Sequence, residues 1–139
     1  MSAVFANDEV MMCIKPGEHG STYGGNPLAC MVAMESLQVL LDENMAENSE
    51  YLGKILREEL RKLPEDVVTI VRGRGLMNAI VINPEFDAWT VCVKLAENGL
   101  LAKPTRGDTI RFTPPLCITE NELRDCLEII KCTIMSFKK

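Results

Sequence analysis

The sequence lacks several groups that would point to common kinds of site. His19 is the only histidine in 139 residues, and the six cysteines include no C-x-x-C pair, so a zinc site is not expected. No apolar run is long enough to cross a bilayer, which excludes a transmembrane helix. The 15 Lys and Arg residues are outnumbered by 20 Asp and Glu, and they are scattered along the chain. A nucleic-acid partner is therefore not expected.

The cysteines favour reduced thiols over a disulfide framework. Most of them lie within apolar runs, where a free cysteine acts as a small hydrophobic side chain. No secretory signal opens the sequence, so an intracellular compartment is expected. A hydrophobic content of 47% in a chain of this length is enough for a core.

A glycine-rich segment, Lys15 to Pro27, dominates the first third of the chain. It reads K-P-G-E-H-G-S-T-Y-G-G-N-P and places Ser21 and Thr22 shortly before Asn26-Pro27, which predicts a helix start. Free amides and the positive end of the helix dipole would then point outward, an arrangement that suits an anion. The spacing alone also fits an ordinary surface loop, and it is not a Walker A loop, because no Gly-Lys-Ser/Thr follows the glycines. His19 is expected to donate to a backbone carbonyl.

The remaining pattern predicts an α/β fold in which helices cover a small sheet. A boundary is expected near residues 44–47, where the character of the sequence changes. The expected elements are a short buried strand at 2–6, a helical turn at 8–14, helices at 27–44 and 46–63, a hairpin of strands 67–71 and 76–82, a helix at 87–98, strands at 100–102 and 109–113, and a final helix from a capping box at 119–122.

The helix expected from Pro27 is apolar almost all round in its first half. Such a helix is buried on several sides or covered by another chain. A core helix is one interpretation, and a subunit interface is the other.

Three arginines could bind anions. Arg111 lies in the strand T-I-R-F-T, so its side chain points away from the face that Ile110 and Phe112 share. Its planar fork would suit a carboxylate, and a structural salt bridge would explain it equally well. Arg72 and Arg74 are expected in the hairpin turn, where an arginine is more often simply exposed.

Several motifs in one order resemble the class III aminotransferases. The run K-P-G-E-H-G-S-T-Y-G-G-N-P-L-A-C resembles the segment that follows the cofactor lysine in that family. Three further stretches, V-R-G-R-G-L-M-N-A-I, E-N-G-L-L-A-K-P-T and I-R-F-T-P-P-L, resemble the family's carboxyl-terminal domain. The resemblance covers essentially the whole chain and is greatest to the members that act on ornithine.

This resemblance implies a fold-type I enzyme that depends on pyridoxal 5'-phosphate (PLP) and works as a homodimer. Residues 1–45 would end the large cofactor-binding domain, and residues 46–139 would form the small carboxyl-terminal α/β domain. The implied reaction moves the δ-amino group of ornithine to 2-oxoglutarate, giving glutamate semialdehyde and glutamate. Members that act on acetylornithine or 4-aminobutyrate remain alternatives, as does a non-catalytic α/β interaction module.

The resemblance also implies roles for individual residues. Ser21 and Thr22 would reach the phosphate of PLP held by the neighbouring subunit, and Arg111 would lie near the substrate carboxylate, where the family can pair it with an upstream glutamate. The lysine that carries PLP would precede the position of Met1, and Lys15 is not a substitute for it. The 139 residues alone are therefore expected to be inactive. The mitochondrial matrix is the implied compartment, with the cytoplasm as the alternative.

Overall fold

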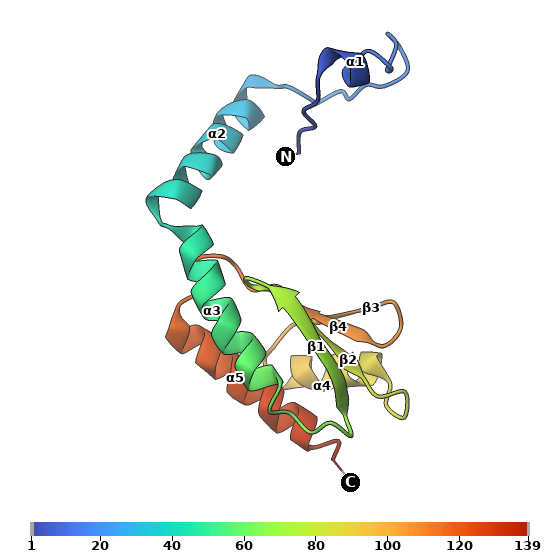
Figure 1. Ribbon diagram of the computed structural model, residues 1–139, viewed down its shortest axis with the longest axis vertical. Coiled ribbons are helices and arrows are strands. Elements are labelled where there is room, and N and C mark those ends of the chain that lie inside the picture. Colours follow the sequence, from blue (N-terminus) through green and yellow to red (C-terminus); the bar gives the residue numbers. More distant parts are fainter. Residues whose placement is uncertain (1, 139) are drawn as a thin grey trace. The chain divides into compact units, whose positions relative to one another are not determined.

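A computed structural model describes residues 2–138 as two compact units, the first ending at Asp42 and the second beginning at Glu43 (Figure 1). The first unit contains α1 (Asp8–Met11) and α2 (Pro27–Asp42). α1 is the helical turn that the sequence predicts, and it begins where Asn7 Oδ1 accepts a hydrogen bond from the Val10 amide at 3.1 Å.

The strand predicted at residues 2–6 is wrong. No strand forms in the described part of the first unit, and the side chains of Val4 and Phe5 are 82% and 93% exposed. A strand requires a neighbour that pairs with its backbone amides and carbonyls. No segment of this unit supplies such a neighbour.

The second unit is built on a four-stranded antiparallel sheet of order β1-β2-β4-β3. No helix in the described residues is long and apolar enough to span a membrane. The elements of this unit are α3 (Met45–Leu60), β1 (Val68–Arg74), β2 (Met77–Ile82), α4 (Ala88–Glu97), β3 (Lys103–Thr105), β4 (Thr109–Phe112) and α5 (Glu120–Met135).

The β1–β2 hairpin is confirmed, but its turn lies further along the chain than predicted. β1 continues to Arg74, which pairs with Met77, so Arg72 lies inside a strand. The turn falls at Gly75, which has a left-handed φ of 51°. α3 packs closely on this turn, because a Cβ on Gly53 would collide with the Gly75 carbonyl.

The strand predicted at residues 100–102 is displaced to Lys103–Thr105. A tight turn at Arg106 and Gly107, both with positive φ (54° and 85°), pairs Thr105 with Thr109 and so fixes which residues form the ladder. Residues 100–102 lie before this ladder begins, and Leu101 is 91% exposed. β3 lies at the edge of the sheet, where its proline is tolerated.

One face of the sheet is buried and the other is open. Along β2 the buried residues are Asn78, Ile80 and Ile82, and β4 adds Ile110 and Phe112 to the same face. These side chains share one core with α3, α4 and α5. Figure 1 shows α3 and α5 side by side along the sheet. The side chains that alternate with these buried residues along β2 and β4, including that of Arg111, point to the opposite face.

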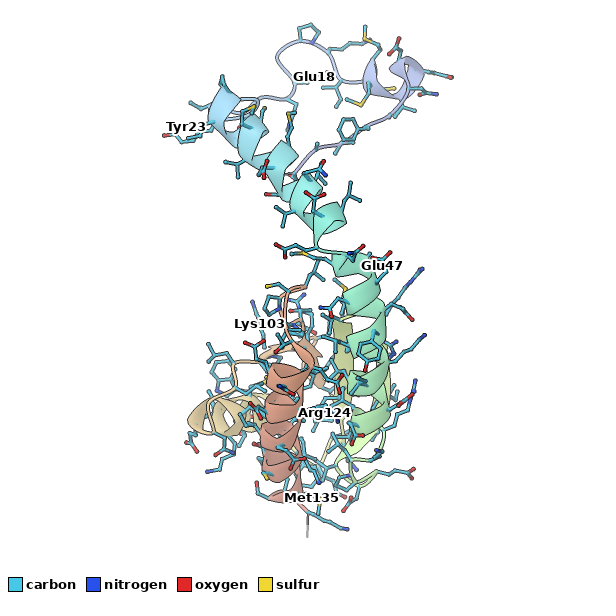
Figure 2. The ribbon with its side chains drawn as sticks, turned by 90° about the vertical axis from the view of Figure 1, so that its left-hand side faces the viewer. Glu18, Tyr23, Glu47, Lys103, Arg124 and Met135 are labelled. Atoms are coloured by element: carbon cyan, nitrogen blue, oxygen red, sulfur yellow. The ribbon has the colours of Figure 1, made fainter. Side chains whose placement is uncertain are left out.

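Two helices of this unit, α4 and α5, begin at the caps that the sequence predicts. Asp87 Oδ2 accepts from the Thr90 amide at 2.8 Å at the start of α4. Thr119 and Glu122 form the capping box of α5. In Figure 2, Arg124 projects from α5. It donates to Glu120, which also accepts from the Tyr51 hydroxyl of α3 at 2.8 Å.

Candidate functional site

The loop of residues 15–27 is shaped by short-range hydrogen bonds. The Lys15 amide donates to Glu18 Oε2 at 2.6 Å, and the Glu18 amide donates back to the Lys15 carbonyl at 3.0 Å. The Lys15 ammonium donates to the Met12 carbonyl at 2.9 Å. Gly17 and Gly25 adopt left-handed φ values of 90° and 72°, which other residues rarely tolerate. Glu18 and Tyr23 mark the loop in Figure 2.

Ser21 and Thr22 expose hydroxyl groups that can donate to an anion. Ser21 Oγ accepts from the Gly24 amide at 3.1 Å, which leaves its own hydrogen free. The Thr22 hydroxyl has no hydrogen-bond partner within residues 2–138. Each hydroxyl can therefore donate to an anion without breaking any hydrogen bond of the loop.

The N-terminus of α2 has fewer free backbone amides for an anion than its sequence suggests. Pro27 has no amide hydrogen, Asn26 Oδ1 accepts from the Ala29 amide at 2.9 Å, and the Asn26 carbonyl accepts from the Cys30 amide at 3.1 Å. The expectation of outward-pointing free amides thus holds only for Leu28 in the described first turn, because Asn26 caps the others. The prediction for His19 is wrong, since its ring has no hydrogen-bond partner among the described residues.

The surface of α2 is apolar and uncovered in this unit. None of its residues is buried, and Leu28, Leu37 and Leu41 are 75%, 64% and 71% exposed. Figure 2 shows side chains projecting from α2 around its circumference. Within the described residues of the first unit, α2 is therefore not a core helix. An exposed apolar surface of this kind is typical of a face that other protein surface covers.

Arg111 lies on the open face of the sheet, as the alternation of its strand predicts. It pairs with Ala79 of β2 on one side and with Lys103 of β3 on the other, while Ile110 and Phe112 face the core. Within the described chain its guanidinium has no ion pair and no hydrogen bond. The salt bridge considered as an alternative is thus not made by these residues.

A concavity of about 490 Å³ lies beside Arg111 and is mostly apolar. Cys126 lines it, and burial, with the nearby Asp125 and Glu122 carboxylates, raises the pKa of this thiol. Burial likewise raises the pKa of Cys92. Thiols of raised pKa are poor nucleophiles. The Cys126 thiol beside Arg111 is therefore poorly suited to act as a nucleophile.

Comparison with known proteins agrees with these features. Residues 1–134 match the aminotransferase class-III family. The chain is 64% identical, over 98% of its length, to the mitochondrial ornithine aminotransferase of Drosophila melanogaster. That match covers 32% of the relative, so the chain spans about a third of the length of this curated protein.

Solved structures share the fold. An ornithine aminotransferase from Plasmodium yoelii superimposes with a TM-score of 0.84 at 48% identity, covering 96% of this chain and 36% of the other. An acetylornithine aminotransferase from Elizabethkingia anophelis gives a TM-score of 0.83 at 56% identity, covering 95% and 36%. The chain is thus similar to enzymes named for two related substrates.

Proposed function

We propose that this chain, which belongs to the class III aminotransferases, is part of an enzyme that transfers the δ-amino group of ornithine to 2-oxoglutarate. The products would be glutamate semialdehyde and glutamate. The observation that carries this proposal is the 64% identity to an ornithine aminotransferase across nearly the whole chain. The mixed helix and sheet fold is that of fold-type I enzymes.

The two units would have different roles in that enzyme. Residues 1–45 would end the large cofactor-binding domain, and residues 46–139 would form the small carboxyl-terminal domain. The second unit supports this division with a core of its own, whereas α2 of the first unit buries none of its residues.

Class III aminotransferases depend on PLP, which when bound acts as the electron sink for the amino-group transfer. In this chain, Ser21 and Thr22 would donate their hydroxyl hydrogens to the phosphate oxygens. Their exposure and free donor hydrogens fit that group. The loop glycines on either side leave open space for it, because a Cβ on Gly20 or Gly25 would have no non-neighbouring heavy atom of the described residues within 4 Å.

Arg111 would orient the substrate by binding its carboxylate. A guanidinium offers two parallel N–H donors that match the two oxygens of a carboxylate. Its position within β4 supports this role, since a strand holds the side chain at a fixed register. Lys15 would take no part in the chemistry, because the family's cofactor lysine would precede the position of Met1.

The enzyme would be a homo-oligomer in the mitochondrial matrix. Class III aminotransferases are generally oligomeric and act on small molecules. The Lys15–Pro27 loop and α2 would form the subunit contact, a role that the exposed apolar surface of α2 supports. The compartment follows from the mitochondrial relative, and the cytoplasm is the alternative.

The identity of the amino donor can be tested directly. The complete enzyme that contains this chain should form glutamate semialdehyde from ornithine and 2-oxoglutarate. Acetylornithine is the competing donor, because the chain is 56% identical to an acetylornithine enzyme. We expect kcat/KM to be higher for ornithine than for N-acetylornithine or 4-aminobutyrate. A preference for either of the other two donors would contradict the proposed substrate.

A further inference from the structure

The loop that connects β4 to the cap of α5, residues 113–118, has few backbone donors of its own. Pro114 and Pro115 have no amide hydrogen, so neither can donate to a neighbouring segment. Within the loop, the Ile118 amide donates to the Pro115 carbonyl at 3.1 Å and closes a turn. The path of the loop therefore depends on donors from elsewhere in the chain that reach its carbonyl oxygens.

Asn48 of α3 supplies such donors. Its Nδ2 donates to the Leu116 carbonyl at 2.8 Å and to the Ile118 carbonyl at 3.1 Å, so both hydrogens of the amide are used. Among residues 2–138, neither carbonyl accepts another hydrogen bond. Figure 1 shows this loop passing the N-terminal end of α3. One half-buried side chain thus fixes two carbonyls that lie 68 and 70 positions further along the chain.

Ser49, the next residue of α3, holds the neighbouring strand. Its Oγ accepts from the Leu76 amide at 3.0 Å, immediately before β2 begins at Met77. β2 and β4 are antiparallel and Asn78 pairs with Phe112, so the start of β2 and the end of β4 lie at the same end of the sheet. Two consecutive residues of α3 therefore hold both strands at this end.

Arg111 lies at the end of the sheet that α3 holds. It is the second-to-last residue of β4 and pairs with Ala79. On the open face its guanidinium has no ion pair and no hydrogen bond among the described residues. The position of Arg111 therefore follows from the backbone of β4, and a shift of the loop after β4 would move the guanidinium with the strand.

We propose that Asn48 is a positioning residue, which keeps Arg111 in place for a substrate carboxylate by holding the loop after β4. The proposal rests on the proposed function, in which Arg111 binds that carboxylate. Asn48 itself would touch neither substrate nor cofactor, because both hydrogens of its amide are used by the loop. Its effect on the reaction would pass entirely through the position of Arg111.

The substitution Asn48→Asp in the complete enzyme tests this assignment. Aspartate keeps the size of asparagine, but at neutral pH it has no hydrogen to donate and places a negative charge against two carbonyl oxygens. Because a misplacement of about 1 Å can cost about 100-fold, we expect the KM for ornithine and the KM for 2-oxoglutarate each to rise about tenfold. The kcat per bound PLP should stay within about twofold, since binding lost equally from the ground and transition states changes KM alone.

Two further variants separate positioning from a general loss of structure. Asn83→Asp is the matched control, because Asn83 Nδ2 also donates to a backbone carbonyl, that of Asp66, at 3.0 Å, in the loop after the far end of β2. It should leave both KM values unchanged. Asn48→Ser removes the amide without adding charge, and it should raise both KM values as N48D does, including the case in which N48D does not fold.

A double-mutant cycle with Arg111→Gln provides the second readout. In the R111Q enzyme, adding N48D should lower kcat/KM by less than about twofold, because two changes that act through one group are not additive. Full additivity of N48D and R111Q would overturn the proposal, and so would equal KM values in N48S and N83D or a fall in kcat with KM unchanged. If ornithine proves not to be a donor, the proposed function fails. The same comparison with N-acetylornithine or 4-aminobutyrate, each of which carries a carboxylate, then still decides the role of Asn48.

Discussion

At the scale of single residues, Ser21 and Thr22 differ in the hydrogen bonds that their hydroxyl groups make within the loop. Ser21 Oγ accepts from the Gly24 amide, so removing it would also disturb the loop. Thr22 has no hydrogen-bond partner among the described residues, and its loss should leave the loop intact. Thr22 is therefore the cleaner probe of phosphate binding.

We expect Thr22→Val to weaken the binding of PLP about tenfold in the complete enzyme. Valine keeps the shape of threonine and replaces only its hydroxyl with a methyl group, and a hydrogen bond to a charged phosphate contributes about 1.5–3 kcal/mol. The apoenzyme would be titrated with PLP and followed by the cofactor's absorbance. Thr69→Val, at an exposed threonine of β1, is the matched control. Unchanged PLP affinity in T22V would remove Thr22 from the phosphate site.

Arg111 and Arg72 differ in how far the nearby sequence predicts their positions in the sheet. The direction of Arg111 follows from the two-residue period of a strand, so the sequence predicts it correctly. The two glycines of R-G-R-G predict a turn at Arg72. The pairing of Arg74 with Met77 instead keeps Arg72 inside β1. Its position beside Ala79 and Arg111 depends on how three strands align, which no short stretch of sequence encodes.

At the scale of elements, the sequence predicts the capped helix starts and the β1–β2 hairpin, but it does not predict the bounds of the strands. The caps at Asp87 and Thr119 bond to residues three positions away, so their whole geometry lies within a few residues. The wrong strand at residues 2–6 and the displaced strand at 103–105 both depend on distant partners or on turn geometry. Apolar runs predict where a strand could form, but the neighbouring strand decides whether it does.

The cap of α4 should make the stability of the second unit sensitive to acid. Hydrogen bonds from the Thr90 hydroxyl and amide and from the Trp89 amide hold the pKa of Asp87 below its usual range. A carboxyl whose pKa is lower in the folded state stabilises the fold above its unfolded pKa, about 3.9 for aspartate. This stabilisation is lost as the pH falls through the folded pKa.

Asp87→Asn isolates this effect, because asparagine also caps helices but does not titrate. The Tm would be measured by circular dichroism from neutral pH down to about pH 2.5, spanning the pKa of an unfolded aspartate. We expect the advantage of the wild type over D87N to shrink below about pH 4. Asp125→Asn, at an exposed aspartate that caps no helix, is the control. A Tm difference that is the same at every pH would contradict the role of the Asp87 charge.

At the scale of the whole molecule, the two units differ in how much apolar surface each one buries. The second unit encloses a continuous core of buried aliphatic side chains from its sheet and its helices. The first unit buries no residue of α1 or α2 and exposes large apolar side chains along both helices. A helix of this composition gains little from its own unit, so its stability requires a partner. A second copy of the enzyme would supply that partner in the proposed function.

Leu37→Glu tests whether α2 lies in the subunit contact. Leu37 is 64% exposed, and burying such a side chain contributes about 1.5–3 kcal/mol, to which the cost of burying a carboxylate is added. We therefore expect the dissociation constant of the oligomer to rise at least about tenfold, measured by analytical ultracentrifugation of the complete enzyme. Val93→Glu makes the same kind of change on an exposed position of α4 and should leave the mass unchanged. Because Ser21 and Thr22 are proposed to reach PLP in the neighbouring subunit, L37E should lose PLP as it dissociates. An L37E enzyme that keeps both its mass and its PLP would place the subunit contact elsewhere.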